Sequence, residues 1–224
     1  MKLLGRAAIA LLIVFISAPL IYGQDLSRYR NFTFGMSVAV VSKEMDGKPA
    51  DAAVIYERPA LIEESTWYPP QPFASSRPAE PVEKVLFSFY NNALYRMLVT
   101  YDSSAIAGLT NEDMIRVISA KYGVATKPVA DLTFPTKSLY GSKEKVIARW
   151  EDSKYSLNLF RSSATDTFAI VMFDKQMDAQ AGVSIAESVK LEEEEAPQKE
   201  ADRLKKETDD LEGERQKNIK ALLP

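Results

Sequence analysis

Apolar and polar residues follow two different periods along this chain. Alternation with a period of two, which is typical of half-buried β-strands, runs through residues 85–101 and again through residues 146–172. Apolar residues three and four positions apart, which favour an amphipathic helix, occur in residues 38–45 and 111–122. Because each helical stretch precedes a strand-rich stretch, the pattern predicts two related units in tandem.

Both expected helices have recognisable ends. Ser37 and Thr110 stand where an N-cap side chain accepts a hydrogen bond from the first turn. Gly47 and Gly123 follow the two helices and offer a C-terminal stop. The expected buried stripes are Val38, Val41 and Met45 in the first helix, and Met114, Val117, Ile118 and Tyr122 in the second.

A hairpin is expected where Asn91–Asn92 interrupts the first alternating stretch, because Asn tolerates the positive φ of tight turns. A two-residue loop would pair Phe87 with Arg96. A three-residue loop that includes Ala93 pairs Phe87 with Met97 instead. We favour the longer loop, since its register gathers the large apolar side chains on one face.

Together these elements predict an α+β fold: an antiparallel sheet with two short helices packed on one face. The sheet would consist of two degenerate βα-β-β repeats, followed by a charged helical tail. The opposite face of the sheet would meet water. The polar side chains left for that wet face are Ser88, Arg96, Thr100, Asn158 and Arg161.

The chain divides into four segments on these patterns. Residues 1–23 are expected to be a signal peptide, and residues 24–104 form the first unit. The first unit contains a proline-rich loop at residues 69–81. The second unit covers residues 105–177, and the tail covers residues 178–224.

The N-terminus is typical of an export signal. Lys2 and Arg6 precede an apolar run at residues 7–22, which matches a secretory signal better than the ~18 or more residues of a spanning helix. We place the cleavage between Gly23 and Gln24. The alternative is an uncleaved membrane anchor.

Composition narrows the chemistry that this chain can perform. It has 28 Lys+Arg and 31 Asp+Glu, but no His and no Cys. Disulfides, thiolate metal sites, Cys nucleophiles, His-based triads and a thioether-linked lipid are therefore excluded. Removal of the signal would take away two bases, so the charge would be 26 − 31 = −5, which gives no drive toward nucleic acid. We expect no cofactor and no metal site.

Several short motifs resemble a known family. Gly35-Met36-Ser37, Val41 and Gly47-Lys48-Pro49 resemble the helix motif of the small outer-membrane-assembly lipoproteins (SmpA/OmlA, or BamE-like), and residues 89–94 look similar to a strand of that family. Gly108-Leu109-Thr110 matches in the second unit. A tandem of such units is similar to the fold of β-lactamase-inhibitor proteins. The resemblance implies a helix-plus-sheet unit that binds proteins rather than catalysing a reaction.

The proline-rich connection is the first candidate for a partner-binding surface. Its sequence favours polyproline-II structure. One interpretation is an exposed aromatic–proline surface that meets a partner. The other is a core tryptophan followed by an extended loop. The candidate residues are Trp67, Tyr68, Pro69, Pro70, Pro72 and Phe73.

The charged tail is the second candidate. Residues 187–220 contain 12 acids and 8 bases. Pro197 is expected to break a helix, so the helix proper should start near Gln198. Leu204 and Leu211 lie seven residues apart. One interpretation is a solvated, partly disordered tail, and the other is a helical arm, residues 198–222, that self-associates weakly or reaches a partner.

We therefore expect an exported protein, periplasmic or secreted, that is not an enzyme and that binds a protein partner in the cell envelope. Nucleic acid is not an expected partner, and a membrane is one only if the N-terminal segment stays uncleaved. One alternative is a membrane-tethered structural protein. The other is an exported hydrolase that uses carboxylates or a Ser/Lys pair, since Ser142 and Lys145 have Ser-x-x-Lys spacing without its companion motifs.

Overall fold

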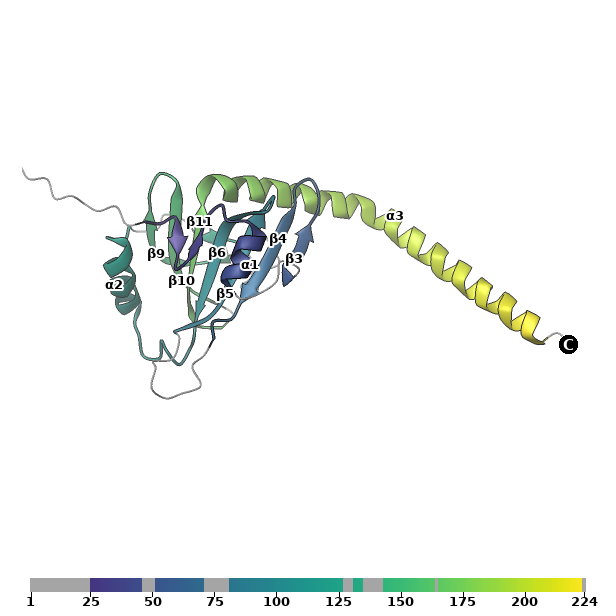
Figure 1. Ribbon diagram of the computed structural model, residues 1–224, viewed down its shortest axis with the longest axis horizontal. Coiled ribbons are helices and arrows are strands. Elements are labelled where there is room, and N and C mark those ends of the chain that lie inside the picture. The colour runs from purple at the N-terminus through teal and green to yellow at the C-terminus, as the bar shows by residue number, and fades with distance from the viewer. Residues whose placement is uncertain are drawn as a thin grey trace, which may run out of the picture.

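The computed structural model describes residues 25–45, 51–70, 81–126, 131–134, 143–163 and 165–222. Its centre is an antiparallel sheet of seven strands in the order β3-β4-β5-β6-β11-β10-β9 (Figure 1). These strands are β3 (Ala53–Tyr56), β4 (Ile62–Trp67), β5 (Val82–Tyr90), β6 (Ala93–Tyr101), β9 (Val146–Glu151), β10 (Tyr155–Arg161) and β11 (Phe168–Asp174).

Two short strand pairs and three helices complete the described chain. The pairs are β1 (Arg28–Tyr29) with β2 (Phe32–Thr33), and β7 (Leu132–Thr133) with β8 (Lys143–Glu144). The helices are α1 (Val38–Glu44), α2 (Asn111–Tyr122) and α3 (Lys175–Leu222). The α+β class predicted from the sequence is confirmed.

The two halves of the sequence meet at the centre of the one sheet. In the first half, α1 precedes the strands β3 to β6. In the second half, α2 precedes the meander β9-β10-β11. The last strands of the two halves, β6 and β11, pair with each other, with Leu98 opposite Val171. Side chains from both halves therefore build one shared core.

The first face of the sheet carries the larger apolar core. Both α1 and α2 contribute to it, as the sequence predicts, through side chains that are at most 5% exposed. The indole nitrogen of Trp150 donates a hydrogen bond of 2.8 Å to the carbonyl of Gly123, which ties the end of α2 to β9. The buried apolar residues of these helices are Val38 and Val41 in α1, and Met114 and Ile118 in α2.

Helix α2 begins and ends where the sequence predicts. Thr110 accepts a hydrogen bond from the backbone of Asp113, and the carboxylate of Asp113 accepts one from the backbone of Thr110 in return. Val117 was expected in the buried stripe, but it is 61% exposed. The stripe is narrower than predicted because α2 covers the rim of the sheet, where only one side of the helix meets the core.

The β5–β6 hairpin confirms the predicted register but corrects the loop. Phe87 lies opposite Met97, yet the loop itself has only two residues, Asn91 and Asn92, both with positive φ. A β-bulge takes up the extra residue, because Ser88 pairs with Arg96 while the next residue, Phe89, pairs with Leu94. Tyr95 is the additional residue, and its side chain packs with α3 rather than with the first face.

The second face is covered, so the prediction of a wet face is wrong. The first turns of α3 lie over it, with Ala181 and Ile185 fully buried against Tyr95 and Ile62. Residues 131–134 and β8 cover the part toward β9. Of the five polar residues assigned to water, Arg161 alone is exposed; the buried ones are Ser88, Arg96, Thr100 and Asn158.

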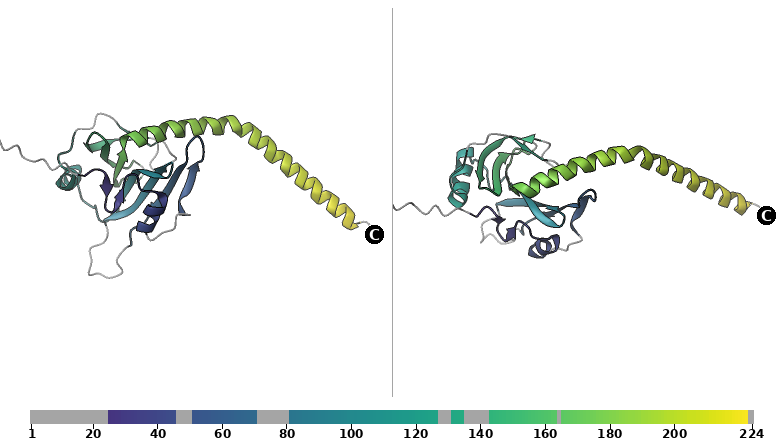
Figure 2. Two further views of the ribbon diagram at one scale, coloured as in Figure 1. Left: turned by 45° about the horizontal axis from the view of Figure 1, so that its top comes forward. Right: turned by 90° about the horizontal axis from the view of Figure 1, so that it is seen from above.

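Helix α3 also differs from the prediction that it starts near Gln198. It is one helix of 48 residues with Pro197 inside it. Proline has no N–H to donate to the residue four positions earlier, so it bends a helix rather than always ending it. Figure 2 shows α3 following the sheet first and then turning away from it. The tail is therefore two structures: a part that completes the fold and a part that projects.

Candidate functional site

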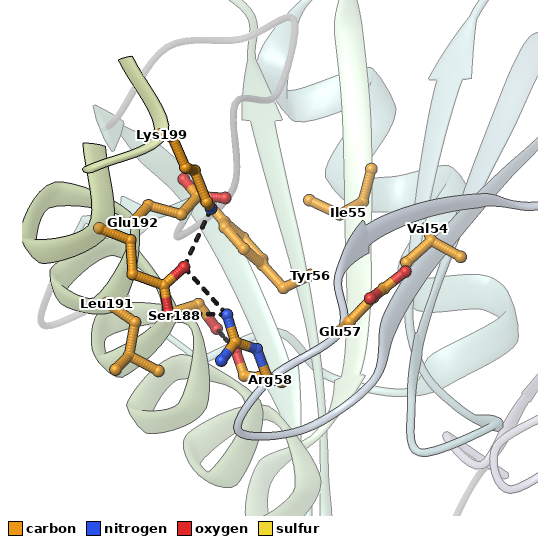
Figure 3. Close-up of a pocket in the computed structure, with 10 residues that line it drawn as sticks. Val54, Ile55, Tyr56, Glu57, Arg58, Ser188, Leu191, Glu192 and Lys199 are labelled. Atoms are coloured by element: carbon orange, nitrogen blue, oxygen red, sulfur yellow. Dashed lines mark hydrogen bonds and ion pairs between the residues drawn. The ribbon is translucent and has the colours of Figure 1, made fainter. Parts of the chain in front are cut away.

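A groove runs between the β3–β4 connection and helix α3, with a volume of about 300 Å³ (Figure 3). One wall is a run of five consecutive residues that starts in β3, and the other wall is a face of α3. The first wall consists of Val54, Ile55, Tyr56, Glu57 and Arg58. The second wall consists of Ser188, Leu191, Glu192, Glu195 and Lys199.

An ion-pair network closes one end of the groove. The guanidinium of Arg58 donates to both carboxylate oxygens of Glu195, at 2.9 and 3.0 Å, and Lys199 lies 3.0 Å from the same carboxylate (Figure 3). These bonds lower the pKa of Glu195, with Lys199 the larger cause and Arg58 the second. Glu195 therefore stays ionised. Its carboxylate links α3 to Arg58 in the β3–β4 connection and does not serve as a proton carrier.

Two further residues join the same walls. The hydroxyl of Ser188, which is 2% exposed, donates to the backbone carbonyl of Arg58. Tyr56 is buried, and its pKa is raised by burial first and then by the negative charges of Glu192 and Glu64. The groove thus has a backbone segment fixed by a hydrogen bond, a buried tyrosine and a net negative charge. These features suit the binding of a polypeptide segment or a cation.

The proline-rich candidates do not form one surface in the described residues. Trp67 packs edge-on against Phe32, with ring centroids 5.4 Å apart, and is only partly exposed. Tyr68 is 65% exposed and Pro70 is exposed, but Pro69 between them is buried. Pro72 and Phe73 lie outside the described residues, as do the cleavage residues Gly23 and Gln24 and the motif residues 47–49.

The residues named for the hydrolase alternative are not brought together by any described contact. Lys145 is exposed between β8 and β9, and Ser142 lies outside the described residues. The carboxylate of Glu64 accepts a hydrogen bond of 3.2 Å from the hydroxyl of Ser88. Asp113 is held in the cap of α2. Each of these two carboxylates is thus engaged in a local structural bond.

A second open pocket, of about 460 Å³, lies between β1 and the end of α2. Its cationic lining residues are Arg28, Arg30 and Lys121, and Asp25 pairs with Arg28 at 3.1 Å. The pKa of Lys121 is lowered by burial first and then by the two neighbouring arginines. The positive charges of Arg28, Arg30 and Lys121 therefore repel one another in this pocket.

The arm is the most exposed feature in the described part of the chain. We use this name for residues 198–222, the part of α3 beyond Pro197, in which every residue is exposed. Side-chain pairs along the arm hold it helical, such as Arg203 with Glu200 and Glu207 at 2.8 and 3.2 Å. Its exposed large apolar side chains are Leu204 (49%), Leu211 (62%), Ile219 (41%) and Leu222 (85%).

Sequence reasoning missed the groove. Its walls come from segments more than 120 residues apart, and no motif marks either of them. One signal was available: Met177, Ala181 and Ile185 follow each other at intervals of four, which predicts a buried helical stripe. Small residues on that stripe, such as Ser184 and Ser188, let the helix approach the sheet closely.

Within the described segments, no three acidic side chains gather where they could ligate a metal ion. No helix there combines the length and the apolar character needed to cross a bilayer. Comparison with models of protein families, with curated proteins and with solved structures finds no match for this chain. The groove and the arm are therefore the candidate functional features of this chain.

Proposed function

We propose that this is an exported, non-catalytic protein that binds another protein in the cell envelope through the arm of α3. Export is proposed from the signal-like residues 1–23. Binding is proposed from one observation above all: the arm extends for about 36 Å beyond the body of the fold and leaves four large apolar side chains in water.

The apolar side chains of the arm are arranged as a stripe. At 3.6 residues per turn, Leu204, Leu211 and Leu222 lie within about 20° of one another around the helix axis. Burial of one leucine side chain contributes roughly 1.5–3 kcal/mol. A partner helix or groove that covered this stripe would gain that energy, whereas the fold of the protein itself gains nothing from it.

The polar faces of the arm support the same proposal. Ion pairs between residues three and four apart, such as Arg215 with Glu212 at 3.1 Å, stabilise an isolated helix without any tertiary contact. The arm can therefore be helical before it binds. Binding then costs less ordering entropy than the folding of a disordered tail would.

Site-specific photo-crosslinking in cells that make the protein tests this proposal. A photoreactive residue at Leu204 or Leu211 should yield one discrete product that contains a second protein, identified by mass spectrometry. The same residue at Lys206 or Asp209, on the opposite face of the arm, is the matched control and should yield none.

Three outcomes would contradict the proposal. Equal yields from both faces would mean random collision, and no product at either leucine would mean that the stripe meets nothing. A product with twice the mass of the chain would mean that the arm binds a second copy of this protein and not a different partner.

A further inference from the structure

The two edges of the central sheet differ. At β9, backbone bonds between Thr126 and Arg149, of 2.7 and 3.2 Å, cover the outer edge. At β3, no described strand pairs on the outer side. Edge strands are usually protected by charge, proline or cover, because their N–H and C=O groups accept another strand. Strand β3 reads Ala-Val-Ile-Tyr, without charge or proline, and Val54 is 51% exposed. It is four residues long, and its pairing with β4 shifts register between Val54 and Tyr56, so the edge is short and locally irregular.

The groove of Figure 3 follows this edge. Its first wall is the backbone run from Val54 to Arg58, and its second wall is α3, which rises beside the strand. A further strand would lie about 4.8 Å from β3. Alternate side chains of that strand would then face the helix wall, where Leu191 is only partly covered. The site therefore offers backbone pairing together with side-chain contacts from α3.

Charge identifies the occupant. The groove is lined by three carboxylates, those of Glu57, Glu192 and Glu195, and by two cations, Arg58 and Lys199. Arg58 and Lys199 engage Glu195, whereas Glu57 and Glu192 form no ion pair with any residue that the structure describes. Burial is the first cause of the raised pKa of Tyr56, and the negative charges of Glu192 and Glu64 add to it. A basic chain fits the groove, and an acidic one is repelled.

We infer that the outer edge of β3, beside the acidic wall of α3, binds an extended segment of a partner protein in which lysine or arginine alternates with apolar residues, and which adds to the sheet as an eighth strand. This inference rests on the proposed function in so far as both require a protein partner. It adds a second contact, which shares only Lys199 with the arm.

The inference can be tested by measuring how synthetic peptides bind to residues 24–224 of the protein. The probe is a ten-residue peptide that alternates lysine with valine. One control peptide has glutamate in place of lysine. The other keeps the lysines but is N-methylated at every residue, so neither of its edges can donate backbone hydrogen bonds to a strand. The lysine peptide should bind at least tenfold more tightly than either control, measured by fluorescence anisotropy.

Hydrogen exchange and one pair of variants locate the bound peptide. The amides of residues 53–56 should exchange at least fivefold more slowly with the lysine peptide present. Glu192→Lys should weaken binding about tenfold, whereas Glu193→Lys, an exposed neighbour outside the groove, should weaken it less than threefold.

Equal affinity for all three peptides, or unchanged exchange in β3, would overturn the inference. Failure here is distinguishable from failure of the proposed function. Crosslinks at Leu204 with no peptide binding would contradict the β3 site and leave the proposal for the arm in place. Peptide binding without crosslinks would contradict the binding role of the arm and leave the β3 site in place.

Discussion

Asn91 and Asn92 are examples of residues that do more than their local signal predicts. Both adopt positive φ, at 47° and 65°, as a tight hairpin turn requires. The side-chain oxygen of Asn91 also accepts the N–H of Leu61 at 3.1 Å, and that of Asn92 accepts the N–H of Val38 at 3.0 Å. One turn therefore holds both the β3–β4 connection and the start of α1.

Substitutions at Asn92 separate these two roles. Asn92→Ala loses the acceptor and strains the backbone, so the free energy of unfolding should fall by about 2 kcal/mol. Asn92→Gly keeps the positive φ and should lose about 1 kcal/mol, while Asn92→Asp keeps the acceptor and should lose less than about 0.5 kcal/mol. Urea denaturation measures the series. Equal losses for all three would show that the bond to Val38 contributes nothing.

At the scale of elements, α3 is two structures in one helix. Its first turns bury Ala181, Ile185 and Ser188 against the second face of the sheet. Beyond Pro197 the arm contacts no described part of the sheet. The stability of the fold should therefore depend on the first part alone.

Truncation tests this division. A chain that ends at Pro197 should unfold within about 2 °C of the full chain, because an arm without tertiary contacts adds no cooperative stability. A chain that ends at Asp174 uncovers the second face and should fail to fold or should aggregate. Thermal unfolding followed by circular dichroism measures both. A large loss on removal of the arm would mean that it packs on the fold in solution.

At the scale of the whole molecule, the sheet has two unlike layers. The first face packs almost entirely apolar side chains, whereas the second contains polar groups under α3. Arg96 of β6 donates to Asp178 of α3 at 2.7 Å, and its guanidinium lies near the rings of Phe134 and Phe173. Burial raises the pKa of Asp178, and the charge of Arg96 opposes that rise.

The loss of stability on removal of the Arg96 side chain should therefore depend on pH. Arg96→Met leaves a buried carboxylate without its cation, so the free energy of unfolding at pH 7 should fall by about 3–5 kcal/mol. Because the pKa of folded Asp178 is already above its ordinary value and rises further, protonation neutralises it as the pH falls, and the loss should shrink toward pH 4.

Two comparisons control this experiment. Arg161→Met removes an exposed arginine that pairs with exposed Asp166, and it should cost less than about 1 kcal/mol at either pH. Arg96→Met combined with Asp178→Leu should recover most of the stability at pH 7. A pH-independent loss for Arg96→Met would argue that packing, not charge, is what Arg96 supplies.

Local signals were sufficient for much of the fold. Caps and apolar spacing predicted α1 and α2, and alternation predicted the pairing of Phe87 with Met97. These features depend on residues close in sequence, or on one apolar face that needs burial. The candidate sites were harder to predict. The run at Trp67 had two interpretations, an exposed surface or a core tryptophan, and the packing of the Trp67 ring on Phe32 agrees with the second.

The sequence by itself determined the α+β class, both short helices and the excluded chemistries, because each follows from short-range patterns or from residue types that are absent. Tertiary structure alone decided that α3 covers the second face and that β3 and α3 form a groove. Its residues, Arg58 and Glu195 among them, lie far apart in the chain. Polar side chains such as Arg96 look solvent-facing in any alternating strand. They are buried because a distant helix supplies their partners.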